Sequence, residues 1–91
     1  MTKAELINEI AIATGYDKTT ISNVVESYMS SVKKSLINGE NVYLRGFGTF
    51  QIKVRKAKIA RNIFASTSVP VPAHRIANFK PCKEFANEMR E

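Results

Sequence analysis

The chain has 91 residues and a mass of 10.2 kDa, with 14 Lys and Arg against 8 Asp and Glu, so its formal net charge is +6 and its pI is about 9.7. The length suits one domain, and neither a membrane-spanning apolar run nor the basic and apolar regions of an export signal are evident. One Cys and one His exclude an internal disulfide and a zinc centre. We therefore expect a cytoplasmic protein without a metal or other cofactor.

Two amphipathic helices are predicted first along the chain. The segment Thr2-Lys3-Ala4-Glu5 has the form of a capping box, and Gly15 is suited to end the helix in a left-handed conformation. Asp17 is a candidate N-cap for the second helix, which then ends at an Asn-Gly pair. The spacing predicts helices over about residues 3–14 and 18–38. The second has an apolar face formed by Ile21, Val24, Val25, Tyr28, Met29, Val32 and Leu36.

The hydrophobic period then changes from helical to alternating. Val42 and Leu44 predict a short strand, and Gly46-Phe47-Gly48 predicts a tight turn. The next strand points apolar residues to one face and polar residues to the other: Phe50, Ile52 and Val54 against Gln51, Lys53 and Arg55. Beyond Val54 the same alternation puts lysines on the face that had been apolar, so the strand has no apolar side chains to bury there. We therefore expect it to extend away from the hydrophobic core as a ribbon.

The return leg of this ribbon is Val69-Pro70-Val71-Pro72-Ala73. Prolines at alternate positions remove N–H groups from one edge, so the strand is able to pair only through its other edge, as in an isolated two-stranded ribbon. We expect an arm over about residues 55–75 with its tip at about Asn62 to Ser68. Pro81 suits the first turn of a final helix that reaches about Arg90.

These elements predict an α+β fold in one domain over residues 1–91. Its predicted parts are a helical dimerisation region (1–44), an antiparallel sheet of three strands with the protruding arm (45–80), and a C-terminal helix (81–91). With about 20 residues in the arm, roughly 70 remain for the core, near the size at which a core is marginal without disulfides or metals. The second helix also has more apolar surface than its predicted neighbours cover. We therefore expect an obligate homodimer.

The positive charge is concentrated in the second half of the chain. Residues 1–44 have a net charge of −1 and residues 84–91 a net charge of −2. Residues 45–83 contain no Asp or Glu and nine basic residues: Arg45, Lys53, Arg55, Lys56, Lys58, Arg61, Arg75, Lys80 and Lys83. This segment predicts a strong local positive potential, and a polyanion would relieve the repulsion among its cations. The plainer interpretation is a solvated basic surface with no partner.

Short motifs along the chain resemble those of one family, the bacterial histone-like group of HU and integration host factor. They are Gly46-Phe47-Gly48-Thr49-Phe50, Arg55, Arg61-Asn62 and Phe79-Lys80-Pro81. The resemblance runs over essentially all 91 residues. It implies an intertwined homodimer whose two arms embrace duplex DNA along the minor groove, with apolar side chains near the tips wedged between base pairs.

The resemblance also implies three groups of functional residues. Together with the charge distribution, which adds Lys56 and Arg75, it gives the residues expected to contact DNA: Lys53, Arg55, Lys56, Lys58, Arg61, Asn62, Ile63, Arg75, Lys80 and Lys83. Ile63 stands where the family has its arm proline, and Ile63 and Phe64 are the candidate wedges. Phe47, Phe50 and Phe79 are expected to form the aromatic core of the dimer. Cys82 replaces a glycine usual in the family, and no glycine turns the arm tip.

The expected function is that of a nucleoid-associated protein that binds duplex DNA largely without sequence specificity, bends it and compacts the chromosome. The main alternative is a helix-turn-helix regulator with residues 18–30 as its recognition helix, but these lie in the half with net charge −1. A membrane-surface binder would need a basic amphipathic helix, whereas these cations lie on predicted strands. We expect no enzyme and no small-molecule substrate, because the sequence shows no catalytic pair and no phosphate-binding loop.

Overall fold

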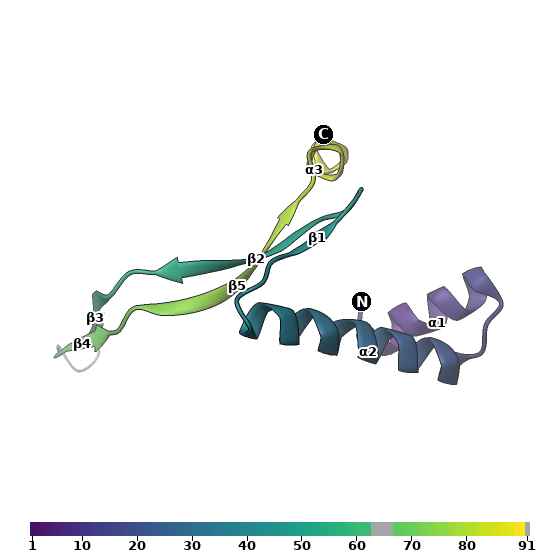
Figure 1. Cartoon of the computed structure of the whole chain (residues 1–91), viewed down its shortest axis with the longest axis horizontal. Helices are drawn as coiled ribbons and strands as arrows, with labels where there is room; N and C mark the ends of the chain where they lie inside the picture. Colours follow the sequence, from purple (N-terminus) through teal and green to yellow (C-terminus); the bar gives the residue numbers. More distant parts are fainter. Residues whose placement is uncertain (63–66, 91) are drawn as a thin grey trace. The chain divides into compact units, whose positions relative to one another are not determined.

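The computed structural model describes residues 1–62 and 67–90 and contains three helices and five strands (Figure 1). In chain order they are α1 (Lys3–Thr14), α2 (Lys18–Ile37), β1 (Val42–Leu44), β2 (Gly48–Arg55), β3 (Lys58–Asn62), β4 (Thr67–Val71), β5 (His74–Pro81) and α3 (Lys83–Met89). The predicted α+β class is confirmed. Contacts divide the chain into two compact units, Met1–Lys34 and Ser35–Glu91, and the single domain stays a prediction. None of the helices in the described ranges has the length and hydropathy to cross a membrane.

Helix α1 has a defined residue at each end. The Thr2 hydroxyl oxygen accepts a hydrogen bond from the Glu5 backbone N–H at 3.2 Å, which satisfies one of the N–H groups that a helix start leaves free. Gly15 adopts φ 79°, a conformation without steric cost for a residue that lacks Cβ, and its N–H donates to the Ala11 carbonyl. Both predicted ends of this helix are confirmed.

Helix α2 begins after Asp17, whose carboxylate caps it. Asp17 Oδ1 accepts a hydrogen bond from the Thr20 backbone N–H at 2.6 Å, and the Asp17 carbonyl accepts one from Ile21 at 3.1 Å. Hydrogen bonds from the Thr20 side chain and then from its backbone lower the pKa of the Asp17 carboxyl, because they stabilise its ionised form. The predicted start is confirmed, and the helix ends at Ile37, one residue before the predicted end.

The apolar face of α2 is only partly covered by this chain. Ile7 of α1 and Ile21 of α2 are the buried apolar side chains among the residues that the structure describes, and Lys3 forms an exposed ion pair with Glu26. In contrast, Val24 is 61% exposed and Tyr28 is 45% exposed. These two side chains belong to the predicted apolar face of this helix, so an apolar surface of α2 remains open to a partner.

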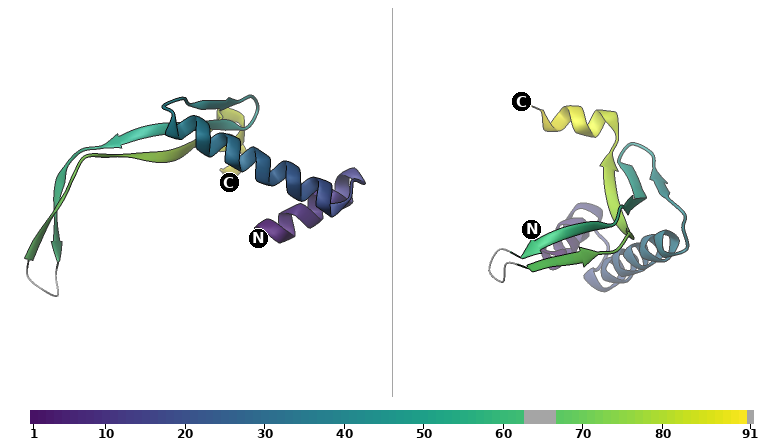
Figure 2. Two further views of the ribbon diagram at one scale, coloured as in Figure 1. Left: turned by 60° about the horizontal axis from the view of Figure 1, so that its bottom comes forward. Right: turned by 90° about the vertical axis from the view of Figure 1, so that its left-hand side faces the viewer.

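The strands form a sheet and a separate ribbon. Strands β1, β2 and β5 form an antiparallel sheet in the order β1-β2-β5, and β3 pairs only with β4. The β3–β4 ribbon continues β2 and β5 past breaks at residues 56–57 and 72–73, where Figure 2 shows it bending. In the ribbon Pro70 lies opposite Ile59, while Pro72 lies in the break. The predicted two-stranded ribbon with its proline-bearing return leg is confirmed.

The turn between β1 and β2 depends on two glycines. Gly46 has φ 79°, and the next residue, Phe47, donates its N–H to the Leu44 carbonyl at 3.0 Å. Gly48 is buried, and a Cβ on it would lie 2.5 Å from the Lys80 carbonyl oxygen and 2.7 Å from the Phe79 ring. A side chain at position 48 would therefore force β2 and β5 apart.

The short strand predicted at Val42 and Leu44 is confirmed as β1. Two other predicted boundaries are wrong. Pro81 does not begin the last helix, because it is still paired with Gly48 at the end of β5, and Cys82 is the N-cap, accepting from the Phe85 N–H at 3.5 Å. Burial of the apolar face of β2 ends at Ile52, since Val54 is 68% exposed.

Asp17→Ala is expected to lower the melting temperature at neutral pH, because the first turn of α2 loses its acceptor. The folded-state pKa of Asp17 lies below its ordinary value of 3.8, so this stabilisation is present above that value and is lost as pH falls through the lowered pKa. The melting-temperature gap between wild type and Asp17→Ala should therefore shrink in acid. Asp17→Asn keeps an acceptor without a charge, and its gap to Asp17→Ala should not change with pH. A wild-type gap that is equally constant contradicts the charge effect.

Candidate nucleic-acid interface

The register of β2 with β5 sorts their side chains onto two faces. Residues directly opposite each other in an antiparallel pair share a face, and the faces alternate along each strand. The apolar face holds the pairs Phe50–Phe79, Ile52–Ala77 and Val54–Arg75. The polar face holds the pairs Thr49–Lys80, Gln51–Asn78, Lys53–Ile76 and Arg55–His74. The sheet therefore has one face suited to packing and one suited to a charged ligand.

Four phenylalanine rings pack together within Ser35–Glu91. The Phe79 ring centroid lies 4.9 Å from that of Phe47 and 5.0 Å from that of Phe50. Phe85 of α3 stacks on Phe47 with centroids 5.6 Å apart. Aromatic pairs at such distances add about 0.5–1.5 kcal/mol beyond the area they bury.

The structure brings together the three predicted aromatic residues and adds Phe85. The signal for Phe85 was its place in a short helix that directly follows the strand of Phe79. Phe47 remains 44% exposed despite its two ring contacts, so the cluster is not closed by this chain. The role of the cluster as a dimer core stays a prediction.

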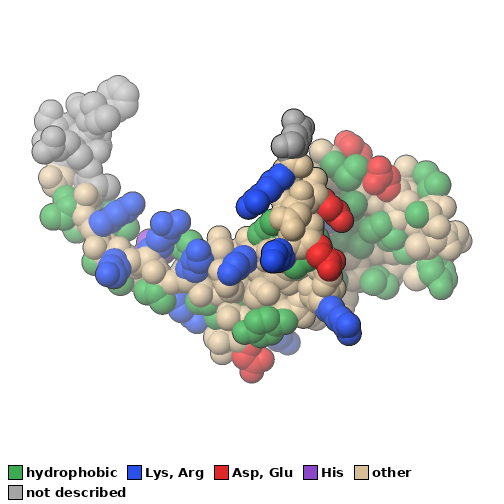
Figure 3. All heavy atoms as spheres, turned by 90° about the horizontal axis from the view of Figure 1, so that it is seen from above, with side chains coloured by type: hydrophobic (Ala, Val, Ile, Leu, Met, Phe, Trp, Pro, Cys, Tyr) green, Lys and Arg blue, Asp and Glu red, His purple; other side chains and the backbone are tan. Residues whose placement is uncertain are grey.

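Most of the predicted basic residues lie exposed on the polar face, along the ribbon or near it. Lys53 and Arg55 of β2 lie on the polar face together with Lys80 of β5. Three further cations, all exposed, are Lys56 in the break after β2, Lys58 at the start of β3 and Lys83 at the start of α3. Figure 3 shows Lys and Arg side chains gathered along the ribbon and the adjoining sheet. We refer to Lys53, Arg55, Lys56, Lys58, Lys80 and Lys83 as the cation strip.

Arg75 is placed apart from the cation strip. Its register position opposite Val54 puts it on the apolar face, and its Nη2 lies 3.4 Å from the carbonyl oxygen of Ile37. That carbonyl belongs to the last turn of α2, where carbonyls lack helical partners and the helix dipole is negative. The Arg75 guanidinium therefore holds the end of α2 and is not aligned with the other predicted DNA contacts.

Of the predicted arm tip, residues 63–66 lie outside the described residues, while the backbone of Asn62, Thr67 and Ser68 belongs to the paired strands. The candidate wedges Ile63 and Phe64 fall within residues 63–66, so both stay predictions. The backbone register pairs Arg61 with Ser68 and Asn62 with Thr67, which brings the predicted contacts Arg61 and Asn62 into β3.

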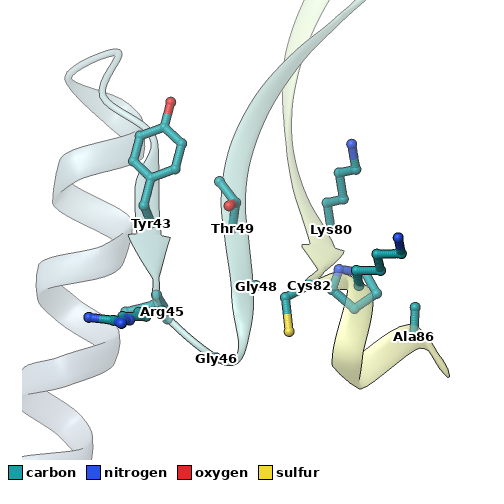
Figure 4. A pocket seen from close by; sticks show the side chains of 11 residues that line it. Tyr43, Arg45, Gly46, Gly48, Thr49, Lys80, Cys82 and Ala86 are labelled. Atoms are coloured by element: carbon teal, nitrogen blue, oxygen red, sulfur yellow. The ribbon is translucent and has the colours of Figure 1, made fainter. Parts of the chain in front are cut away.

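A hollow of about 680 Å³ opens beside the β1–β2 turn (Figure 4). One part of its wall is a cross-strand row formed by Tyr43, Thr49 and Lys80. Its charged lining residues are Arg45, Lys80 and Lys83, and no carboxylate lines it, so its potential favours an anion. Tyr43 and Arg45 were not assigned to a site from the sequence, although their alternation with Val42 and Leu44 was a signal for an outward face. No group of His, Cys, Asp and Glu suited to a metal ion occurs in the described ranges.

Comparison with known proteins gives one consistent result. The family described as Bacterial DNA-binding protein matches residues 1–90. DNA-binding protein HU of Thermus thermophilus is 33% identical over 91 residues, which is 100% of this chain and 94% of that protein. Integration host factor subunit alpha of Vibrio atlanticus is 35% identical over 81 residues, or 89% of this chain and 83% of that protein. The Anabaena HU-DNA cocrystal structure matches with a TM-score of 0.90 at 28% identity, covering 97% of this chain and 96% of that chain.

Proposed function

This chain belongs to the bacterial DNA-binding family of HU and integration host factor, and we propose that it is a histone-like protein that binds and bends duplex DNA. The observation that carries the proposal is the cation strip, which lies in a segment without Asp or Glu. A surface of this kind neutralises phosphates and releases their condensed counterions, which supplies affinity without sequence readout. The similarity to a structure solved with DNA supports the same ligand.

The ribbon gives the strip a shape that suits the minor groove. Two strands are narrow enough to follow the groove of a deformed duplex, and Lys58 begins the outgoing leg. We infer DNA contacts from the cation strip together with Arg61 and Asn62. Arg75 is expected to contribute least, since its guanidinium is held at the Ile37 carbonyl. Recognition then depends on phosphate charge and on how easily the duplex deforms, not on base edges.

We further propose that an apolar side chain at the arm tip kinks the duplex. Ile63 is the first candidate because it occupies the place of the family's arm proline, and isoleucine is among the residues that wedge between base steps. Phe64, the next residue, is the second candidate. Wedges of this kind exchange some base stacking for a bent duplex that contacts more protein surface.

The functional unit that we propose is a homodimer with two arms. Support comes from apolar side chains that this chain leaves uncovered, Phe47 at 44% exposure on the aromatic cluster and Val24 at 61% on α2. Monomeric proteins rarely leave large apolar patches to water. A dimer also presents the cation strip twice, so one duplex is held from two sides.

These properties describe an architectural protein of the nucleoid. We propose that it compacts chromosomal DNA in the cytoplasm, and that it acts by binding and bending rather than by catalysis. The work of bending comes from binding free energy, so no nucleophile, metal or cofactor is required.

Removing cations from the strip should weaken DNA binding and its salt dependence together. Arg55→Ala and Lys58→Ala are each expected to make the slope of log K against log salt shallower by about 0.9 for each phosphate that is no longer neutralised. Fluorescence anisotropy with a short duplex over a salt series measures both quantities. Lys18→Ala is the matched control, because it removes one cation from α2 and would disrupt a helix-turn-helix reader. A reduction for Lys18→Ala equal to that for Lys58→Ala would contradict the proposed interface.

The bend of the bound duplex should depend on the arm tip more strongly than the DNA affinity depends on it. Ile63→Ala is expected to reduce the bend of a bound duplex with a small decrease in affinity, whereas Arg61→Ala should lower affinity with a small change in bend. Energy transfer between dyes at the duplex ends reports the bend, and gel shifts on bent, nicked and linear duplexes report affinity. Equal weak binding of the wild type to all three, without a bend, would exclude the wedge.

Dimerisation predicts a solution mass of about twice the 10.2 kDa chain. Because unfolding of a dimer releases two chains, the melting temperature should also rise with protein concentration. Sedimentation equilibrium and thermal unfolding over a hundredfold concentration range measure these properties. A single-chain mass with a concentration-independent melting temperature would rule the dimer out.

A further inference from the structure

The one histidine of the chain, His74, lies where the sheet becomes the ribbon. It is the first residue of β5, directly after the break at residues 72–73, and it pairs with Arg55, the last residue of β2. This register puts its exposed side chain on the polar face beside the cation strip. An imidazole is therefore positioned at the base of the arm, on the surface that we propose for DNA.

One nitrogen of the His74 ring is held by the backbone. Nδ1 lies 3.0 Å from the carbonyl oxygen of Pro72. A carbonyl oxygen only accepts hydrogen bonds, so Nδ1 carries the proton and donates it. In the neutral ring Nε2 is then an acceptor without a proton, and it becomes a donor only in the imidazolium form. The contact with Pro72 orients the ring and leaves Nε2 as the atom whose role changes with protonation.

The charged groups that the strand register of the described residues places next to His74 are all cationic. Arg55 lies directly opposite, and Lys53 is the next residue along β2 on the same face. Lys56 follows Arg55 in the break, and Arg75 adjoins His74 in β5 but belongs to the apolar face. No Asp or Glu occurs between residues 45 and 83. A positive charge on His74 thus has no carboxylate partner in this segment. A DNA phosphate would be an anionic partner for it.

We propose that His74 is a proton-dependent phosphate contact, whose imidazolium donates a hydrogen bond from Nε2 to a backbone phosphate at the base of the arm. This inference rests on the proposed DNA-binding function. A neutral ring presents a lone pair to the phosphate oxygens and is repelled, whereas the imidazolium forms a charge-assisted hydrogen bond. Binding by the neutral ring therefore takes up one proton from solvent per arm, and DNA affinity rises as pH falls.

The test compares the DNA affinity of wild type, His74→Gln and His74→Arg at about pH 5.5 and about pH 7.5. At about 0.1 M salt the wild type should bind about fivefold to tenfold more tightly per arm at the lower pH, the effect of one further neutralised phosphate. His74→Gln keeps a donor for the Pro72 carbonyl and never becomes charged, so it should bind weakly at both values. His74→Arg should bind tightly at both values.

Calorimetry gives a second measurement that a merely structural histidine would not affect. Near pH 6.5 the heat of DNA binding by the wild type should depend on the ionisation enthalpy of the buffer, because a proton is taken up. The heat for His74→Gln should not depend on the buffer. Wild-type DNA binding with the same pH profile as His74→Gln and no buffer-dependent heat would overturn the inference and leave the proposed function standing. Failure of wild type and His74→Arg to bind DNA at either pH would overturn both.

Discussion

The antiparallel pairing of β2 with β5 is the interaction on which the rest of Ser35–Glu91 depends. It runs without interruption from Gly48↔Pro81 to Arg55↔His74. Because side chains alternate along a strand, a slip of one residue in either strand would move its phenylalanine (Phe50 or Phe79) to the polar face and its lysine (Lys53 or Lys80) to the apolar face. Gly48 secures this register at one end, since only a residue without Cβ permits the close approach to the Lys80 carbonyl. The aromatic cluster and the cation strip are thus two results of one register.

Much of the fold is encoded locally and was predictable for that reason. Both ends of α1 and the start of α2 follow from Thr2, Gly15 and Asp17, which act on backbone groups within four residues of themselves. The ribbon follows from prolines that forbid pairing on one edge. Features that depend on residues distant in sequence were not predictable in this way. Charge counted along the chain placed Arg75 with the other cations, and only the pairing with Val54 and the Ile37 carbonyl shows that it lies elsewhere.

The roles of Pro81 and His74 were not predictable from the sequence for the same reason. Pro81 has a fixed φ that suits the first turn of a helix, and it is also tolerated at the end of an edge strand, so its identity alone does not decide between them. His74 looks like an incidental surface residue in the sequence, because neither the Pro72 carbonyl nor Arg55 can be assigned to it before the strand register is known. In both cases a residue type allows several roles, and long-range pairing selects one.

The return leg of the ribbon has a further consequence for the protein in a crowded setting. Residues 67–73 carry no charge, and Pro70 lies in β4 opposite Ile59 with Pro72 just beyond it. An exposed strand edge ordinarily recruits strands from other molecules and leads to aggregation, but the β4 strand lacks an N–H at Pro70 and stops before Pro72, which interrupts such a ladder. Neighbouring copies packed closely on one duplex would therefore not join their ribbons through β4 into a continuous intermolecular sheet.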